Sequence, residues 1–335
     1  MRRVPADTAK QREELVRIVN TSLPSAEDRD FFAALLGSFS RRDDPLRANE
    51  AWLREYLKTR PQPDEQEKLR FVAALKANML FVQGGSFIMG DFGIYTKAKT
   101  PINSDKNNPP HKVTLDSYGL MKGRVTYGEY DFYSRMAGRP IPNVDDRIYL
   151  GERYPGYTVR PILWADADSY CQWLGRFTQQ PFALPTDAQW EYAARERGKF
   201  VAYPAHHMPE IRWANEYIPF FDSLDEALQN IKEKAGRSAY LGEPRPTGLF
   251  GANRIGMQDV IGATYEWVAD WYDPDYFKQS PERNPQGPSS GEKRVVRPSA
   301  YGDYRSLVVR RAKDPLTHDE QTQFRCALNS PLPWR

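Results

Sequence analysis

Cysteine has the most distinctive chemistry of any residue type in this chain, and it occurs only twice, at Cys171 and Cys326. Thiolates are nucleophiles and ligands for soft metals. The two side chains could also pair, but two cysteines among 335 residues do not make a disulfide framework. Because free cysteine is among the most buried side chains, we interpret both residues as buried thiols.

The histidines give little indication of a metal site. His206 and His207 are adjacent, so in an extended chain they would point to opposite sides. No third ligand follows at a recognisable spacing, and we do not expect zinc there. His111 stands alone, and we expect it to make a structural hydrogen bond.

The composition predicts a soluble globular protein of one large domain or two ordinary ones, with 40% hydrophobic and 27% charged residues. A net charge of only +3 argues against nucleic acid or an anionic membrane as the main partner. The sequence has no apolar run of about 18 residues or more, so we expect no membrane span. The basic N-terminus lacks an apolar core, so we expect a cytoplasmic protein, or a periplasmic one whose signal peptide has been removed.

Residues 1–76 have the pattern of a small helical region. Apolar residues recur at helical spacing in segments that begin near Asp7, Ser25, Asp44 and Asp64. We expect the last segment to bury Leu69, Val72 and Leu75. The region is either a cap packed on the main domain or a docking module for a protein partner, and periodicity does not choose between them.

The pattern changes at Met79. The segment MLFVQGGSFIMGD is apolar and interrupted by glycine, so we predict a hairpin with its turn at Gly84–Gly85. Further on, Val113 and Leu115 lie at alternate positions, as in a half-buried strand. We expect Thr126 to cap the helix that follows.

Two helices are predicted between Arg160 and Arg195. The first places five side chains on one face, Ala167, Tyr170, Cys171, Leu174 and Phe177. The second begins after Thr186, which has Gln189 three residues on, the spacing of a capping box.

These stretches resemble the formylglycine-generating enzyme and sulfatase-modifying factor family. The match includes the Tyr-Cys-x-Trp helix at 170–173, Leu-Pro-Thr at 184–186, Trp-Glu-Tyr-Ala-Ala-Arg at 190–195, and the segment 247–272. The resemblance implies a mixed α+β, C-type-lectin-like fold with little regular secondary structure over about 77–335. Nothing in it covers 1–76, so we expect an N-terminal helical region before one main domain.

The resemblance also shows where this chain departs from the family. Arg297 to Tyr301 and Gln323 to Ala327 frame the family's C-terminal core. Counted without gaps, the two redox cysteines of the enzymes fall on Asp303 and Val308, and an active-site serine falls on Ala300. Soft sulfur selects copper(I), whereas aspartate is a hard ligand and valine is none. Formylglycine formation is therefore not expected.

The resemblance implies calcium as a further cofactor. The family begins one calcium site at the position of Asn215 and has an asparagine in another site where this chain has Ala263. Calcium needs about six to eight oxygen ligands, so the loss at Ala263 should weaken that second site. We retain Asn215 as the one candidate calcium ligand.

The family's substrate is an extended peptide, so the resemblance implies a groove for a protein partner. Aromatic and arginine side chains anchor such interfaces. The predicted lining is Tyr301, Asp303, Tyr304, Arg305, Glu266, Trp267 and Arg310. The alternative is that these residues fill the former site as ordinary core and ion pairs.

The sequence therefore predicts a non-catalytic binding or regulatory protein that holds another protein. The resemblance implies an accessory or immunity role in a bacterial secretion system, type VI included. The alternative is an oxygen-dependent oxidase without the cysteine pair. The resemblance implies this alternative because one branch of the family matures a siderophore chromophore by oxidation without the pair. Another branch, with iron on histidine-bearing helices, is excluded because residues 1–76 contain no histidine.

Overall fold

The computed structural model describes residues 50–97, 99, 101–102, 108–146, 153, 155–202, 247–248, 252–260, 264–298, 306–318 and 321–334. The chain divides into two compact units, one of residues 1–74, 126–159 and 230–246 and one of residues 75–125, 160–229 and 247–335. Within the described residues, no helix combines the length and apolarity needed to cross a membrane.

The first unit is helical where it is described. Its helices are α4 (Glu50–Thr59), most of α5 (Glu65–Asn78) and α6 (Tyr127–Met136). The ring of Phe71 on α5 stacks on Phe132 of α6, with 4.0 Å between the centroids. Arg135 of α6 donates two hydrogen bonds to Glu67 of α5, at 2.5 and 3.0 Å. These contacts fix α5 and α6 against each other.

The structure tests two sequence predictions for the helices of this unit. Thr126 caps α6 in a capping box with Glu129, as expected. The expected burial of Leu75 is confirmed and Val72 is half-buried, but the expected burial of Leu69 is wrong, because its side chain is 70% exposed. The buried face of α5 carries Phe71 beside Leu75. Those two residues are one helical turn apart, and Leu69 lies on the opposite side of the helix. The helices predicted to begin near Asp7 and Ser25 lie outside the described residues.

The second unit starts with a long antiparallel ribbon. Strands β1 (Met79–Val82) and β2 (Gly85–Met89) pair with β4 (Tyr118–Met121) and β3 (His111–Leu115), and the register is the same on both sides of the break. The predicted hairpin at Gly84–Gly85 is therefore wrong, since β1 and β2 follow one another along the ribbon. Glycine is needed at Gly84 because a Cβ there would lie 2.3 Å from the carbonyl oxygen of Leu115.

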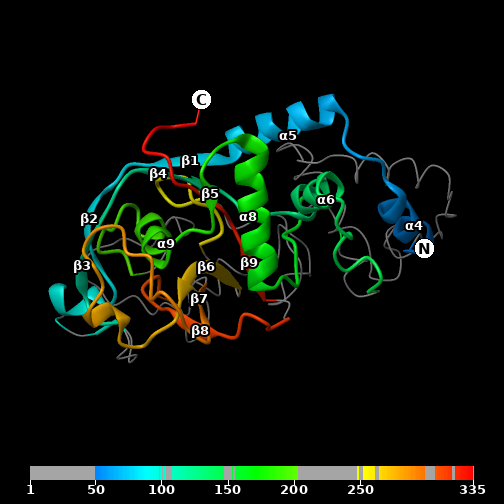
Figure 1. Cartoon of the computed structure of the whole chain (residues 1–335). Coiled ribbons are helices and arrows are strands. Elements are labelled where there is room, and N and C mark those ends of the chain that lie inside the picture. The colour runs from blue at the N-terminus through cyan, green and yellow to red at the C-terminus, as the bar shows by residue number, and fades with distance from the viewer. Residues whose placement is uncertain are drawn as a thin grey trace, which may run out of the picture. The chain divides into compact units, whose positions relative to one another are not determined.

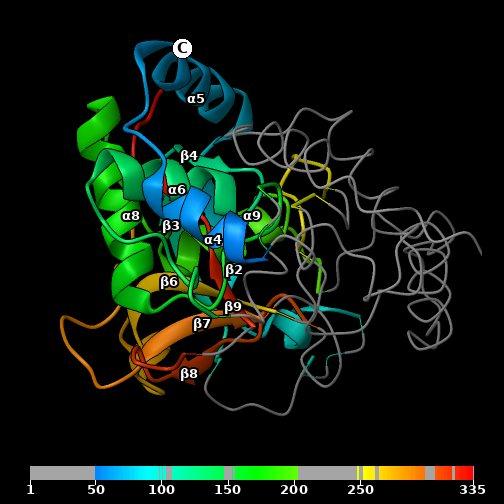
Figure 2. The same ribbon diagram turned by 90° about the vertical axis from the view of Figure 1, so that its right-hand side faces the viewer.

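The remaining strands complete two four-stranded sheets. One has the order β1-β4-β10-β5, with β5 at Phe182–Ala183 and β10 at Ala327–Leu328. The other has the order β8-β7-β6-β9, from strands β6 (Tyr265–Trp271), β7 (Arg294–Pro298), β8 (Arg311–Lys313) and β9 (Thr322–Phe324). Only the β6–β9 pair in this second sheet is parallel. Strands β6, β7 and β8 lie side by side in both views (Figures 1 and 2).

Helix α9 (Asp187–Ala194) is the central element of this unit. It packs against β2 and β3 on one side and against β6 and β7 on the other (Figure 1). The predicted capping box of Thr186 and Gln189 is confirmed at its N-terminus. The ring of Trp190, on this helix, is fully buried in a core that also contains Val113, Leu120 and Val268. Two short 3₁₀ helices, η1 (Phe92–Tyr95) and η2 (Tyr276–Lys278), flank this core.

Helix α8 (Trp164–Thr178) carries the predicted apolar face, with Ala167, Tyr170 and Leu174 buried. Cys171 on this face forms a disulfide with Cys326. Our interpretation of two buried thiols is therefore wrong, although both sulfurs are buried. The disulfide links α8 to the segment between β9 and β10. The mixed α+β class is confirmed by these sheets and helices.

Candidate functional site

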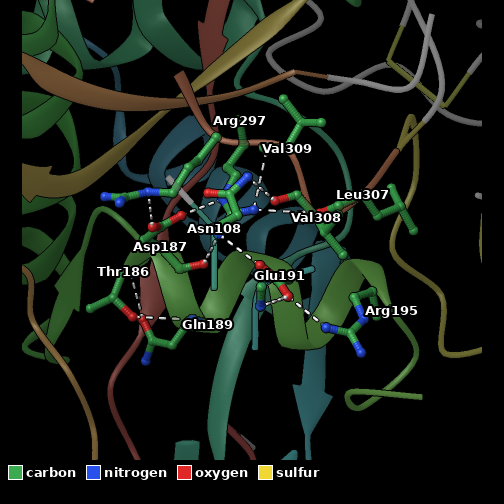
Figure 3. Close-up of polar contacts among 12 residues, drawn as sticks. Asn108, Thr186, Asp187, Gln189, Glu191, Arg195, Arg297, Leu307, Val308 and Val309 are labelled. Carbon is green, nitrogen blue, oxygen red and sulfur yellow. Dashed lines mark hydrogen bonds and ion pairs between the residues drawn. The ribbon is translucent and has the colours of Figure 1, made fainter. Parts of the chain in front are cut away.

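Helix α9 directs three charged side chains to one face. Asp187, Glu191 and Arg195 are spaced four residues apart, so they lie along one side of the helix. Arg297 on β7 faces them: its Nε forms an ion pair with Asp187 Oδ1, and its Nη2 donates to Glu191 Oε2 at 2.9 Å. Figure 3 shows Asp187 and Glu191 pointing from the helix toward Arg297. The site is thus built by one helix and one strand.

Glu191 connects this pair to the ribbon. Its Oε1 atom accepts hydrogen bonds from Arg195 Nη1 at 2.6 Å and from the backbone nitrogen of Gly90 at 2.9 Å. Gly90 has φ +90°, and a Cβ there would meet the carbonyl oxygen of Pro109 at 2.8 Å. Glycine at this position therefore allows the backbone after β2 to approach the carboxylate.

Arg310 lies on the other side of Asp187. Its Nε is 3.0 Å from Asp187 Oδ2, and its Nη1 donates to the carbonyl oxygen of Asp273 at 3.2 Å. The guanidinium stacks on the ring of Phe277, 4.4 Å from its centroid. Arg310 is 1% exposed, so it acts as an interior ion-pair partner in this structure.

A third carboxylate, that of Asp270 on β6, accepts a hydrogen bond from the backbone N–H of Asp187 at 2.8 Å. Burial and the neighbouring Asp187 carboxylate together raise the pKa of Asp270 to about 7. For Arg297, burial opposes the charge, but Asp187 and Glu191 more than compensate and raise its pKa. The network therefore keeps the guanidinium of Arg297 charged, and it contains one carboxyl group, that of Asp270, with a pKa near neutral pH.

Glu266 and Trp267, two predicted groove residues, lie on β6 with their side chains in the interior. Glu266 accepts hydrogen bonds from Arg325 at 2.7 and 2.8 Å and from Arg124 at 3.0 Å. Burial alone would raise the pKa of Glu266, but the two guanidiniums outweigh it and lower the pKa to about 2. Trp267 donates its indole N–H to the carbonyl oxygen of Ile162 at 3.0 Å.

The other four predicted groove residues, Tyr301, Asp303, Tyr304 and Arg305, lie outside the described residues. The groove as a whole therefore stays a prediction. The structure brings Glu266 and Trp267 together on one strand and places Arg310 in the Asp187 network, each as an interior side chain.

Val308 occupies one of the positions where the family resemblance places a redox cysteine. Its side chain is fully buried in an apolar cluster with Phe92 and Ala202. Its carbonyl oxygen accepts a hydrogen bond from the amide of Asn108 at 3.2 Å, as Figure 3 shows. The chain's own cysteines are bonded to each other. These residues do not fit copper(I), because they offer no thiolate at Val308.

Calcium is a separate question, because Asn215 and Ala263 both lie outside the described residues. Across the described part of the chain, no cluster of three or more histidine, cysteine or acidic side chains has the arrangement of a metal site.

Sequence reasoning missed the ion-pair network. The acidic and basic residues of α9 recur at a spacing of four residues, which is the one local signal of the network in the sequence. Their partners are about a hundred residues away in the chain, and no spacing rule connects Asp187 with Arg297. His111 contacts the carbonyl oxygen of Pro109 at 3.3 Å, in line with the expected structural hydrogen bond.

Comparisons with known proteins agree with this architecture. Residues 66–330 match the FGE-sulfatase family model, described as a sulfatase-modifying factor enzyme 1-like domain. The formylglycine-generating enzyme of Streptomyces coelicolor is 31% identical over 294 residues, which cover 74% of this chain and 88% of that protein. A mouse relative named inactive C-alpha-formylglycine-generating enzyme 2 is 27% identical over 211 residues, 58% of each chain.

A relative of different name covers more of this chain. Serine/threonine-protein kinase pkn1 of Chlamydia caviae is 26% identical over 295 residues, 82% of this chain but 41% of the kinase. This chain therefore spans less than half of that protein's length.

Two solved structures share the fold. PvdO from Pseudomonas aeruginosa has a TM-score of 0.52 at 20% identity and covers 75% of this chain and 93% of its own. Treponema denticola variable protein 1 has a TM-score of 0.54 at 18% identity and covers 75% and 95%. At these identities the likeness concerns the fold alone.

Proposed function

Since the chain belongs to the family of sulfatase-modifying factor enzyme 1-like domains, we propose that it is a non-catalytic member that uses this fold to hold another protein. The single observation that carries the proposal is the environment of Val308. That side chain fills an apolar cluster with Phe92 and Ala202, where the family resemblance places a metal-binding thiol.

The chemistry of the available sulfur supports the same proposal. A copper(I) site needs two thiolates that face one ion. The chain has two cysteines, and their sulfurs form a disulfide between α8 and the end of the β9 segment. A mouse relative carries the word inactive in its name, so loss of catalysis has a precedent among proteins similar to this chain.

The first experiment measures catalysis directly. The purified full chain is incubated with copper(I), oxygen and a cysteine-containing peptide, and mass spectrometry detects conversion of the thiol to an aldehyde. The Streptomyces coelicolor enzyme serves as the positive control. We expect neither aldehyde nor oxygen uptake from this chain. Aldehyde formation would overturn the proposal, and oxygen uptake with another substrate would favour the oxidase alternative.

The second experiment tests the groove. The natural partner is isolated on the immobilised protein and its stoichiometry is measured by size-exclusion chromatography. Tyr301→Ala and Arg305→Ala should each weaken the complex without changing the melting temperature, because aromatic and arginine anchors carry most of an interface's energy. Lys293→Ala, an exposed lysine outside the groove, is the control. Normal affinity in both groove variants would refute the groove.

We also propose where the protein is located, what role it has there and which metal it binds. The disulfide favours an oxidising compartment, so we propose the periplasm as the protein's location. The role that we propose there, an accessory or immunity protein of a secretion system, comes from the family resemblance. We also propose that Asn215 takes part in a weak calcium site. Calcium should raise the melting temperature relative to chelator in the native protein but not in Asn215→Ala. Equal shifts in both proteins would place the calcium elsewhere.

A further inference from the structure

Three large apolar side chains are exposed on the second unit, two of them on η1 and one shortly after α9. Ile94 and Tyr95 on η1 are 47% and 56% exposed, and Phe200, six residues after α9, is 51% exposed. Phe200 stacks on Phe92, also on η1, with 5.0 Å between the ring centroids. We call Ile94, Tyr95 and Phe200 the η1–Phe200 surface. Phe92 and Tyr95 are three residues apart in a 3₁₀ helix, so their side chains share one side of η1. A single exposed apolar residue is ordinary, but a group of them is typical of an interaction site.

The base of this surface is rigid. Phe92 is 1% exposed, and the Arg195 guanidinium lies 4.2 Å from the centre of its ring. Arg195 is held by Glu191 at 2.6 Å and by the carbonyl oxygens of Ile88 at 2.8 Å and Lys199 at 3.0 Å. The exposed aromatic ring of Phe200 therefore rests on a stack anchored in the buried ion-pair network. Such a platform loses little conformational freedom when a partner binds.

The same stack continues to the position of the missing thiol. Phe92 contacts Val308 in the apolar cluster, and the backbone nitrogen of Leu307 donates to the carbonyl oxygen of Ala202 at 2.7 Å. Val308 thus packs in the cluster that includes Phe92, on which Phe200 stacks. Valine at position 308, where the resemblance places a cysteine, therefore contributes to the packing that supports the η1–Phe200 surface.

The rim of the surface is basic. Lys97 and Lys99 follow Tyr95 in an exposed turn. Lys199, 53% exposed, precedes Phe200 and forms an ion pair with Glu196 at 3.2 Å. The carboxylates of the same segments are turned inward: Asp91 is 7% exposed and accepts the backbone N–H groups of Gly93 and Ile102, and Glu196 is 1% exposed. Among the described residues of these segments, the outward charges are positive.

We propose that the η1–Phe200 surface binds an acidic segment of a partner protein, which places a leucine or aromatic side chain on Phe200. The exposed rings supply the apolar contact, and the lysine rim attracts carboxylates and sets the orientation of the segment. The inference rests on the proposed function, since it names the chemistry of the protein partner, but it uses residues outside the predicted groove.

The test uses a labelled short peptide rich in glutamate, leucine and phenylalanine, with binding to the full chain followed by fluorescence anisotropy. One control peptide carries lysine in place of glutamate, and another carries serine in place of leucine and phenylalanine. We expect only the acidic apolar peptide to bind, and its affinity to fall with rising salt because the charges lie at the surface.

Phe200→Ser and Lys99→Glu should each weaken the binding of this peptide about tenfold. Lys99 is exposed, so Lys99→Glu should not change the melting temperature. Phe200→Ser loses the stack on Phe92 and should lower the melting temperature only slightly. Leu316→Ser, which removes a side chain that is 77% exposed elsewhere, and Lys293→Glu are the matched controls and should bind normally. Equal affinity in the surface and control variants, or equal binding of the lysine peptide, would overturn the inference.

The outcome is independent of the catalytic assay. Aldehyde formation by the purified protein would end the non-catalytic proposal, while peptide binding lost in Phe200→Ser would still support this surface. Absence of peptide binding together with absence of aldehyde would reject the surface and leave the non-catalytic proposal standing.

Discussion

Trp190 donates its indole N–H to the carboxylate of Glu266 at 3.0 Å, and both side chains are fully buried. This bond joins the central helix α9 to strand β6. Glu266 also forms ion pairs with Arg325 and Arg124, so the negative charge of its carboxylate is compensated in the interior. A buried carboxylate with two guanidiniums and an indole is costly to disturb, because removing one donor leaves polar groups without partners.

We therefore expect Trp190→Ala to destabilise the protein by about 3–5 kcal/mol, the usual cost of truncating a buried tryptophan. Trp190→Phe keeps most of the apolar volume and loses the N–H donor, so its cost should be about 1–3 kcal/mol. Urea unfolding followed by circular dichroism measures both. Leu332→Ala, at a side chain that is 70% exposed, should change little. An unchanged melting temperature in Trp190→Ala would contradict the core assignment.

Glu129 gives the stability of the first unit a dependence on pH. Its Oε2 accepts the backbone N–H and the hydroxyl of Thr126 at 2.8 and 2.9 Å, and burial raises the pKa of Glu129 from 4.5 to about 7. A raised carboxyl pKa means that the folded protein holds the proton more tightly. The stabilisation is thus fully present below pH 4.5 and is lost as the pH rises through about 7.

Glu129→Gln retains an oxygen acceptor for the cap and removes the titration. Between these two pH values the wild type should lose on the order of 3 kcal/mol relative to this variant. Chemical unfolding at a series of pH values measures the difference. Glu65→Gln, at a carboxylate whose side chain is 84% exposed, is the control and should follow the wild type. Parallel curves for wild type and Glu129→Gln would refute the raised pKa.

The sequence predicted local features of the fold well. The capping boxes at Thr126 and Thr186 depend on residues three positions apart, and both form as expected. The apolar face of α8 also follows from spacing within one helix. These signals are local in the chain, so tertiary packing had little opportunity to override them. The overall α+β class was predicted from the motifs that resemble the family.

Contacts between distant segments could not be predicted in this way. Glycines at Gly84 and Gly85 have the composition of a turn, but Gly84 is required by close approach to the backbone of Leu115. Cys171 and Cys326 are separated by 155 residues, and their pairing depends on where α8 lies against the β9–β10 segment. The Asp187–Arg297 ion pair likewise depends on the meeting of a helix and a strand. Neither partner carries a local signal of the other.

The disulfide should contribute substantially to stability. It closes a loop across a sequence separation of 155 residues, and cross-links of this kind contribute about 2–5 kcal/mol. Replacing Cys171 and Cys326 together by alanine should lower the free energy of unfolding by that amount. A reductant should destabilise the wild type to a similar level and leave the double variant unchanged. Two titratable thiols in the unfolded, unreduced wild type would show that the bond does not form.

Restoring sulfur at the family's positions tests the argument on which the non-catalytic proposal depends. Val308 is fully buried, and cysteine is a small hydrophobic residue, so Val308→Cys should fold. Combined with Asp303→Cys, it would place two thiols where the resemblance puts the redox pair. We expect this double variant to bind about one equivalent of copper(I) in competition with a chromophoric chelator, because paired thiolates select that ion. The wild type and each single variant should not compete with the chelator.

The matched control is Asp303→Cys with Val309→Cys, which has the same number of thiols shifted by one position. Val309 is also buried, at 2% exposure, but the apolar cluster with Phe92 and Ala202 contains Val308 and not Val309. The shifted pair should therefore bind copper(I) more weakly than the pair at Asp303 and Val308. Equal binding by both pairs, or none by either, would mean that Val308 does not occupy the position of the lost ligand, and the proposal would then lack its main support.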